Sequence, residues 1–515
     1  MTRGRSIALL GFVCVVTILR VWNTHHLFSP TYDEPIHVAA GYEYLAEHRY
    51  SIDVQHPPLA RLFFAWPLRH ARLTGGDGLE HYAQVYEGAG QYMEGVATSR
   101  RGNLVFVLLA IVAVTLWARS LFGTPTALMA GALFALLPPV LAHGGLATTD
   151  MAGAAAFPLA MLAMTQWVTS PSWRRTLFLA VAIAVGLLSK FSFPLFFAIG
   201  AIAVMASKRR FPAAKGIAAH LLAFLLVWMV YLGEYGRMDH VDADAGRIAT
   251  ELFGSPAISG VALPAPAFFL GLMQVKRHDR VGHAAYFMGN MREKGWWYYF
   301  PVIVAIKTPL PFLALAGAGA WLAVRRRRHR HLVVIAVAIL ASTMTSHINL
   351  GARHILPIFA PLSLLAAYAV MTAWQEGKRG RWLVAPLCLW LGVDSAFAHP
   401  DYLPWMNVLA GSHPEKIVLD SNFDWGQDMV RLRHECQRRG VTSLGIRLFG
   451  KADLGRIGLP PTHPIEDFHA LPGWYAVSES EVVLTQLADP VALFWLTDGT
   501  KFIRVGKTVR LYHVE

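Results

Sequence analysis

Long apolar runs alternate with short polar segments along the first three quarters of the chain. A run of about 20 apolar residues is long enough to cross the hydrocarbon core of a bilayer as a helix. The pattern therefore predicts a polytopic α-helical membrane protein with about 11 transmembrane helices. The candidate segments are 7–22, 102–119, 125–142, 149–168, 176–189, 193–207, 216–233, 299–323, 332–347, 355–374 and 382–398.

Basic residues predict the orientation of these helices. If the N-terminus is inside, the clusters of Lys and Arg between the apolar runs, such as 325–328, fall in inner connections, as the positive-inside rule requires. Arg100 and Arg101 break this pattern. The outer side then receives the long polar segments 23–101 and 234–298 and the tail from residue 399. Functional residues are therefore expected on the outer side.

The tail beyond the last apolar run has a different pattern. The periodicity of 427–439 predicts a helix, and Asp424 and Gln427 have the spacing of a capping box at its start. We expect residues 399–515 to form a soluble extracytoplasmic α/β domain covering the active face of the transmembrane domain, residues 1–398. Short runs of strand-forming residues predict strands over 416–420, 443–449, 474–477 and 509–514.

Composition narrows the class of protein. The chain has 515 residues, of which 55% are hydrophobic and 15% charged, with a formal net charge of +13. Because Lys and Arg lie in short clusters between apolar runs, the charge fits membrane orientation and excludes a nucleic-acid partner. Cys14, Cys388 and Cys436 are too far apart in sequence to indicate a zinc site or a disulfide framework. No small-residue cleavage site follows the first apolar run, so we expect a retained first helix.

Candidate chemistry begins at Asp33 and Glu34, two adjacent carboxylates just beyond the first apolar run. Charged groups at a membrane face need solvation or partners. One interpretation makes Glu34 the N-cap of a helix whose first residue is Pro35. The other makes a carboxylate at this helix start a general base, which accepts the proton of a hydroxyl nucleophile.

Further polar residues stand at the outer ends of the predicted helices. Each has a structural explanation, since a helix start tolerates Asp and long basic side chains can reach lipid headgroups. Together, carboxylates and cations on one face outline a site for a phosphorylated, membrane-borne substrate. The residues are Asp150, Lys190, Lys307, Arg353 and His354, with His56 and Arg61 in the first outer segment.

Several motifs resemble those of a known family. In their order along nearly the whole chain they are similar to the bacterial branch of glycosyltransferase family 39. These are integral-membrane GT-C enzymes related to protein O-mannosyltransferases and to the aminoarabinose transferase acting on lipid A. Where the aminoarabinose branch has a lysine before Pro-Pro-Leu, this chain has His56. The motifs are Tyr32-Asp33-Glu34-Pro35, His56-Pro57-Pro58-Leu59, Ala147-Thr148-Thr149-Asp150, Gly282-His283-Ala284-Ala285-Tyr286, Gly295-Trp296-Trp297-Tyr298-Tyr299-Phe300-Pro301, Lys307-Thr308-Pro309, Arg353-His354-Ile355-Leu356-Pro357 and Asp420-Ser421-Asn422-Phe423-Asp424-Trp425-Gly426-Gln427-Asp428.

The resemblance implies inverting transfer of a sugar from a polyprenyl-phosphate donor to an acceptor hydroxyl. The acceptor would be a glycan, a lipid or a protein at the periplasmic face of a bacterial inner membrane. Asp33 is the expected general base, while Glu34 and Asp150 would orient a substrate or share a divalent cation. Expected around the donor phosphate are His56, Arg61, Lys190, Lys307, Arg353 and His354. Expected near the acceptor are Tyr32, His283, Tyr286, Trp296 and Trp297.

A lipid-linked sugar flippase or transporter is the alternative. Such a protein would also combine many membrane spans with charged residues inside them. It should in addition show internal repeats and interrupted helices in matching halves. The sequence shows no such self-similarity, which favours the enzyme.

Overall fold

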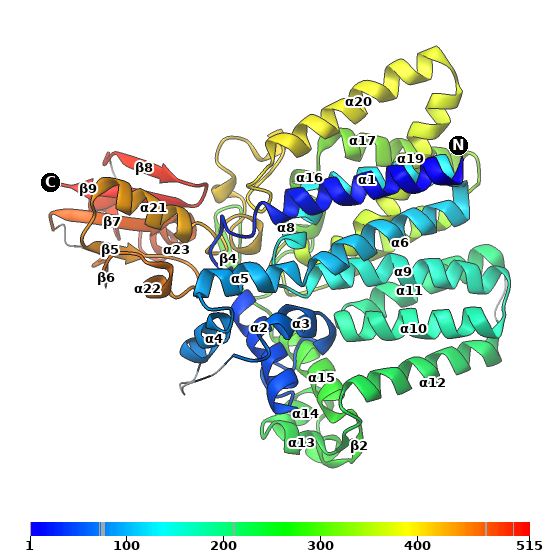
Figure 1. Cartoon of the computed structure of the whole chain (residues 1–515), viewed down its shortest axis with the longest axis horizontal. Helices are drawn as coiled ribbons and strands as arrows, with labels where there is room; N and C mark the ends of the chain where they lie inside the picture. Colours follow the sequence, from blue (N-terminus) through cyan, green and yellow to red (C-terminus); the bar gives the residue numbers. More distant parts are fainter. Residues whose placement is uncertain (1, 72, 74–77, 210–211, 469–470, 498) are drawn as a thin grey trace.

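The computed structural model describes residues 2–71, 73, 78–209, 212–468, 471–497 and 499–515. Long helices run side by side through most of the molecule, and a small sheet with its helices lies at one end of them (Figure 1). Short helices of the first outer segment lie between these two parts. The structure is thus a helical membrane protein with a C-terminal mixed sheet, which confirms the predicted fold class in outline.

Helices are found at all of the predicted spans. Within the described residues, five are long and apolar enough to cross a membrane, or up to seven if each of two bent pairs is one span. The larger number of spans therefore stays a prediction. The helices are α1 (Arg3–Trp22), α6 (Leu104–Phe122), α7 (Thr124–Ala135), α8 (Pro138–Gly144), α9 (Asp150–Thr169), α10 (Trp173–Ser189), α11 (Phe193–Lys208), α12 (Ala213–Val230), α16 (Tyr299–Lys307), α17 (Leu310–Arg325), α18 (Arg330–Thr343), α19 (Phe359–Gln375) and α20 (Lys378–Phe397).

Two of the predicted spans contain a bend. Helices α7 and α8 meet at 67° within 125–142, and α16 and α17 meet at 115° within 299–323. Proline explains both bends, because a residue without an N–H cannot continue the hydrogen bonding of the preceding turn. Pro138 begins α8, and Pro309 lies between α16 and α17.

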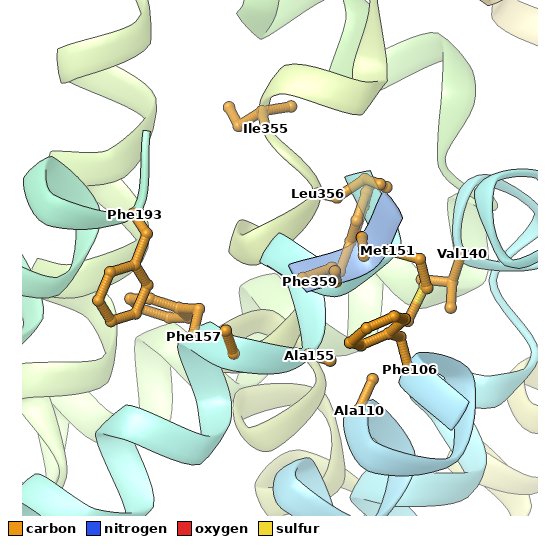
Figure 2. Close-up of a cluster of buried hydrophobic side chains, with 14 of the residues drawn as sticks. Phe106, Ala110, Val140, Met151, Ala155, Phe157, Phe193, Ile355, Leu356 and Phe359 are labelled. Carbon is orange, nitrogen blue, oxygen red and sulfur yellow. The ribbon is translucent and has the colours of Figure 1, made fainter. Parts of the chain in front are cut away.

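Helix α9 is the buried centre of the helical bundle. Its sequence is rich in Ala and Met, whose small or flexible side chains let neighbouring helices approach closely. Met151 and Phe157 of α9 belong to the same buried cluster as Phe106 of α6 and Phe359 of α19 (Figure 2). This packing fixes Asp150, the first residue of α9.

The first outer segment folds into short helices. Residues 34–47 form a helical segment, α2 followed by a π-helical turn, and most of its residues are buried. Asp33 is the N-cap, whereas Glu34 already lies within the first turn, so the interpretation of Glu34 as N-cap is wrong by one residue. The elements are α2 (Glu34–Tyr42), the π-helical turn η1 (Glu43–Glu47), α3 (Pro58–Ala65), η2 (Trp66–Leu68), α4 (Gly78–Glu87) and α5 (Tyr92–Arg101).

The second outer segment is a mixture of short strands and helices. The apolar stretch 255–275, which Pro264 and Pro266 interrupt, is divided among η3, β2 and α15. The elements are β1 (Tyr235–Gly236), α13 (Met238–Val241), α14 (Ala245–Phe253), η3 (Pro256–Gly260), β2 (Leu263–Pro264), α15 (Pro266–Val281), β3 (Ala285–Phe287) and β4 (Asn290–Arg292). Strands β3 and β4 pair as an antiparallel hairpin beside the candidate site.

The C-terminal domain contains a five-stranded sheet in the order β6-β5-β7-β9-β8. Strand β5 is parallel to β6 and β7, while β9 is antiparallel to β7 and β8. Three of the predicted strands and the predicted helix are present. The elements are α21 (Met429–Arg439), β5 (Leu444–Arg447), α22 (Leu454–Ile457), β6 (Thr462–Pro464), β7 (Gly473–Ser478), α23 (Glu479–Ala488), α24 (Phe494–Thr497), β8 (Phe502–Val505) and β9 (Val509–Val514).

Two details of this domain differ from the prediction. The expected strand over 416–420 is a chain of 3-10 turns with one isolated bridge. The expected capping box is also absent, because α21 begins at Met429 and its N-cap is Asp428. The Asp424 carboxylate instead accepts the backbone N–H of Ser480 at 3.0 Å. The 3-10 turns between α20 and α21 are η6 (Val408–Ala410), η7 (Pro414–Lys416) and η8 (Asp420–Asn422).

Candidate functional site

Two adjoining cavities open between the helical bundle and the C-terminal domain. The smaller has a volume of about 230 Å³ and the larger about 300 Å³. Both cavities are lined by Asp33, His283, Leu350 and Arg353, so these residues form the boundary between them. Three of these four were expected at the site from the sequence.

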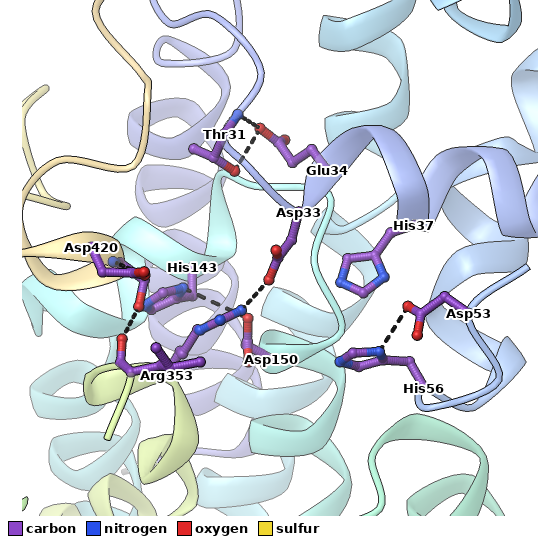
Figure 3. A network of polar contacts seen from close by, with 12 residues as sticks. Thr31, Asp33, Glu34, His37, Asp53, His56, His143, Asp150, Arg353 and Asp420 are labelled. Atoms are coloured by element: carbon purple, nitrogen blue, oxygen red, sulfur yellow. Dashed lines mark hydrogen bonds and ion pairs between the residues drawn. The ribbon is translucent and has the colours of Figure 1, made fainter. Parts of the chain in front are cut away.

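Asp33 and Arg353 form an ion pair at this boundary (Figure 3). Asp33 is the N-cap of α2, and Arg353 lies in the 3-10 turn η4 (Ala352–His354), which is followed by η5 (Leu356–Ile358). The Arg353 guanidinium also lies over the Trp425 ring, 4.6 Å from its centre. The Arg353 side chain is buried, whereas the Asp33 side chain is 23% exposed and is open to a ligand.

A second ion pair joins Asp150 and Lys190 in the larger cavity. Asp150 begins α9, where the helix dipole favours a negative charge, and Lys190 follows the end of α10. The Lys190 ammonium also donates to the carbonyl oxygen of Arg353 at 3.4 Å. The two ion pairs are therefore neighbours, and they connect four residues that are far apart in the sequence.

Arg61 lies outside the larger cavity, next to His37, Asp53 and His56, which line it. The Arg61 guanidinium donates to the Asp53 carboxylate and lies 3.1 Å from Nδ1 of His37, while Nδ1 of His56 is 3.0 Å from Asp53. Burial opposes the charge on Asp53, but the Arg61 guanidinium outweighs it and holds the pKa of Asp53 below its usual value. Burial also holds the pKa of His37 well below that of a free histidine.

The same group has the composition of a metal site. His37, Asp53 and His56 each offer one ligand atom, and these atoms lie within 4.8 Å of one another. The Arg61 guanidinium, however, contacts both Nδ1 of His37 and the Asp53 carboxylate. It supplies positive charge where a metal ion would bind, so the group is an ion-pair network around Arg61.

Aromatic side chains dominate the smaller cavity. Tyr32, Tyr286, Tyr299 and Trp425 line it, together with the carboxylate of Asp420. Burial raises the pKa of Asp420 above its usual value, although the Arg353 guanidinium acts in the opposite direction. A flat apolar wall with two carboxylates, one on Asp33 and one on Asp420, suits a hydroxyl-bearing ligand.

Backbone hydrogen bonds join the segment before Asp33 to the C-terminal domain. The N–H of Ser29 donates to the carbonyl oxygen of Gln427 at 3.0 Å, and the N–H of Tyr32 donates to that of Trp425 at 3.1 Å. The Ser29 hydroxyl also donates to the carbonyl oxygen of Gly426 at 2.7 Å. The C-terminal domain is thus attached directly beside Asp33.

Glu34 lies apart from both cavities. Its carboxylate accepts two hydrogen bonds from Arg100, at 2.7 and 2.8 Å, and one each from the N–H groups of Thr31 and Ala147. Burial opposes its charge, but Arg100 outweighs this effect and lowers the pKa of Glu34. Arg100 in turn donates to three backbone carbonyl groups of residues 25–29. Glu34 therefore connects Asp33 to the segment that leads to Asp150.

The other expected residues divide clearly between the cavities and their surroundings. Lys307 is buried elsewhere, where it donates to the backbone carbonyl groups of Leu403 and Asn422. Trp296, Trp297 and Arg61 also line neither cavity. Besides Asp33 and Arg353, which line both cavities, the expected residues that line the smaller cavity are Tyr32, His283 and Tyr286. Those that line the larger cavity are His56, Asp150, Lys190, His283 and His354.

The structure adds residues that the sequence did not single out. Asp420 lies in a motif of the family, but it was not among the residues expected at the site. His37 lies four residues after Asp33, one helical turn away, and this spacing could have indicated it. Lys451 of the C-terminal domain lines the larger cavity, and no sequence pattern pointed to it.

Comparisons with known proteins agree with this architecture. Residues 96–232 match the family described as dolichyl-phosphate-mannose-protein mannosyltransferase. The crystal structure of ArnT from Cupriavidus metallidurans bound to undecaprenyl phosphate is similar, with a TM-score of 0.54, 12% identity, and coverage of 99% of this chain and 98% of that chain. The apo state of the same protein gives a TM-score of 0.50, 14% identity, and coverage of 97% of both chains. No curated protein matches the sequence. The resemblance expected from the motifs is therefore confirmed.

Proposed function

We propose that this glycosyltransferase, whose residues 96–232 match the mannosyltransferase family, transfers a sugar from a polyprenyl-phosphate donor to an acceptor hydroxyl with inversion. The reaction would occur at the extracytoplasmic face of a bacterial inner membrane. The ArnT structure with undecaprenyl phosphate supports a donor of this chemical class. The observation that carries the mechanism is the position of Asp33, which lines both cavities.

The larger cavity is the proposed donor site. Its lining includes Lys190, Arg353, His56 and His354, which are able to face a phosphate. When the bond between sugar and phosphate breaks, negative charge develops on the phosphate oxygen that leaves. Fixed cations stabilise this charge without reorganising, which is a large source of rate acceleration.

A neighbouring apolar groove can hold the polyprenyl chain. The groove has a volume of about 730 Å³ and is lined by residues of α9, α10, α11 and α12. It starts at Leu187 and Phe193, which flank the segment 190–192 of the donor cavity. It follows α11 to Met205, a path of about 18 Å at 1.5 Å per residue. A lipid with its phosphate at Lys190 therefore has an apolar path for its tail.

The smaller cavity is the proposed acceptor site. The acceptor oxygen attacks the anomeric carbon from the side opposite the phosphate, and its proton passes to the Asp33 carboxylate. The bond between the anomeric carbon and the phosphate oxygen breaks, and polyprenyl phosphate leaves as an anion. Arg353 holds Asp33 in place, and Glu34 with Arg100 supports the helix start that carries it.

The reaction can be tested with purified protein in vesicles. The donor would be a polyprenyl phosphate whose sugar is radiolabelled, and the acceptors would come from an extract of envelope glycans, lipids and proteins. We expect the label to leave the lipid and polyprenyl phosphate to accumulate. If intact donor instead changes leaflet without losing its sugar, the protein is the flippase considered above and the proposal is wrong.

A further inference from the structure

Lys451 lies on the loop that follows β5 of the C-terminal domain, yet it lines the donor cavity together with Asp33, Lys190 and Arg353. Its ammonium is 4.0 Å from the centre of the Tyr32 ring, a cation–π contact. Tyr32 is the residue before Asp33. The C-terminal domain therefore places a positive charge beside the proposed base.

The loop that carries Lys451 is fixed on both sides. On one side, the Phe449 ring stacks on Tyr32 with centroids 5.3 Å apart, and the Phe449 N–H donates to the Ser478 hydroxyl at 3.1 Å. On the other side, the N–H of Asp453 donates to the Tyr92 hydroxyl at 3.2 Å. A short loop held at both ends keeps Lys451 in the lining of the cavity.

Gly450 shows how closely this loop is packed. Its φ of +141° is a conformation that favours glycine, and a Cβ at this position would lie 3.2 Å from the Cα of Gly426. The backbone of the loop thus approaches the 425–427 segment, which is hydrogen-bonded to Ser29 and Tyr32. The position of Lys451 is therefore set by packing within the C-terminal domain, against the segment that joins this domain to Ser29 and Tyr32.

Lys451 differs from Lys190 and Arg353 because no carboxylate among the described lining residues of the cavity neutralises its charge. Arg353 is paired with Asp33, and Lys190 with Asp150. The third carboxylate that lines the cavity, Asp53, is paired with Arg61. Among the described residues, no carboxylate forms an ion pair with Lys451.

We propose that Lys451 binds the phosphate of the lipid donor, so that the C-terminal domain completes the donor site. This inference rests on the proposed function. A phosphate diester carries one negative charge, and the paired cations of the cavity are already neutralised by carboxylates. Lys451 supplies the uncompensated positive charge, and its aromatic support on Tyr32 holds the ammonium in place.

The test is the affinity of the purified full chain for undecaprenyl phosphate and for the uncharged undecaprenol. For Lys451→Met, we expect the affinity for the phosphate lipid to fall about tenfold or more, which corresponds to about 1.4 kcal/mol per tenfold. The affinity for undecaprenol should not change, since the apolar groove is intact. Lys451→Arg should retain most of the phosphate affinity, because the positive charge is kept.

Lys501→Met is the matched control, because Lys501 is an exposed lysine of the same domain, and it should bind both lipids like the wild type. If Lys451→Met binds undecaprenyl phosphate as tightly as the wild type does, the role of Lys451 is refuted while the proposed function stands. If Lys451→Met lowers the affinity for both lipids equally, the role of Lys451 is structural and the inference is also refuted. If the wild type itself does not prefer the phosphate lipid, the proposed donor class is wrong.

Discussion

Replacing Asp33 by asparagine would test the proposed general base most directly. Asp33→Asn keeps the size of the side chain and one oxygen that can face Arg353, but it removes the proton acceptor. A positioned general base contributes typically ~10²–10⁴-fold to a rate. At about 1.36 kcal/mol per tenfold, the expected rise of the activation barrier is about 2.7–5.4 kcal/mol.

Asp33→Asn also removes a negative charge beside Arg353, which affects both the stability of the protein and its binding of the lipid. Removing one partner of a buried ion pair can cost about 3–5 kcal/mol of stability. The Asp33 side chain is 23% exposed, however, and Asp150 and Asp420 also act on Arg353, so we expect a smaller loss. Because Asn does not neutralise the guanidinium, binding of undecaprenyl phosphate should be unchanged or tighter.

The assay is release of labelled sugar from a polyprenyl-phosphate donor at saturating donor and acceptor, with lipid affinity measured in parallel. Asp244→Asn is the control, since Asp244 lies at the exposed start of α14 and should behave like the wild type. Asp420→Asn tests the rival carboxylate of the acceptor cavity. Full turnover in Asp33→Asn together with lost turnover in Asp420→Asn would move the role of base to Asp420.

Three further predictions concern the surroundings of the site. Glu34→Gln should destabilise the protein by about 3–5 kcal/mol, because it leaves the buried Arg100 unpaired; an unchanged thermal midpoint would contradict this. Lys190→Met should weaken binding of undecaprenyl phosphate, whereas Asp150→Asn should strengthen it by freeing the Lys190 charge. If both variants bind the lipid with the affinity of the wild type in a titration, this ion pair is not part of the donor site. Burial raises the pKa of Asp424 from 3.8 to about 7. Between these two pH values the folded protein keeps a proton on Asp424 that the unfolded chain has lost. The free energy of unfolding should therefore fall as the pH rises from 3.8 to about 7. Asp424→Asn should flatten that fall in a series of thermal melts, and an unaltered pH dependence would show that Asp424 does not titrate in this way.

Much of the site could be predicted because the residues stand at the ends of recognisable helices. Asp33, Asp150, Lys190 and Arg353 each begin, end or adjoin an apolar helix on the side assigned as outer. Helices that are packed side by side bring such ends together. For these residues, position along the chain was enough to predict proximity.

The roles of Glu34 and Lys307 could not be predicted in the same way. Asp33 and Glu34 are adjacent and chemically alike, and only the fold shows that Glu34 faces Arg100 while Asp33 faces the cavities. Lys307 lies at a helix end like the others, but the bend after α16 turns it toward the backbone carbonyl groups of Leu403 and Asn422. A bend changes the direction of a side chain without changing its place in the sequence.

The attachment of the C-terminal domain beside Asp33 also has a consequence for biosynthesis. The hydroxyl of Ser29 and the carbonyl group of Gly426 that it contacts are 397 residues apart. At about 5–20 residues per second, a ribosome needs roughly 20–80 s to make the chain between them. During that time the segment that carries Asp33 lacks these partners, and both cavities are incomplete. We therefore expect activity toward the proposed donor lipid to begin only after nearly all of the chain has been made.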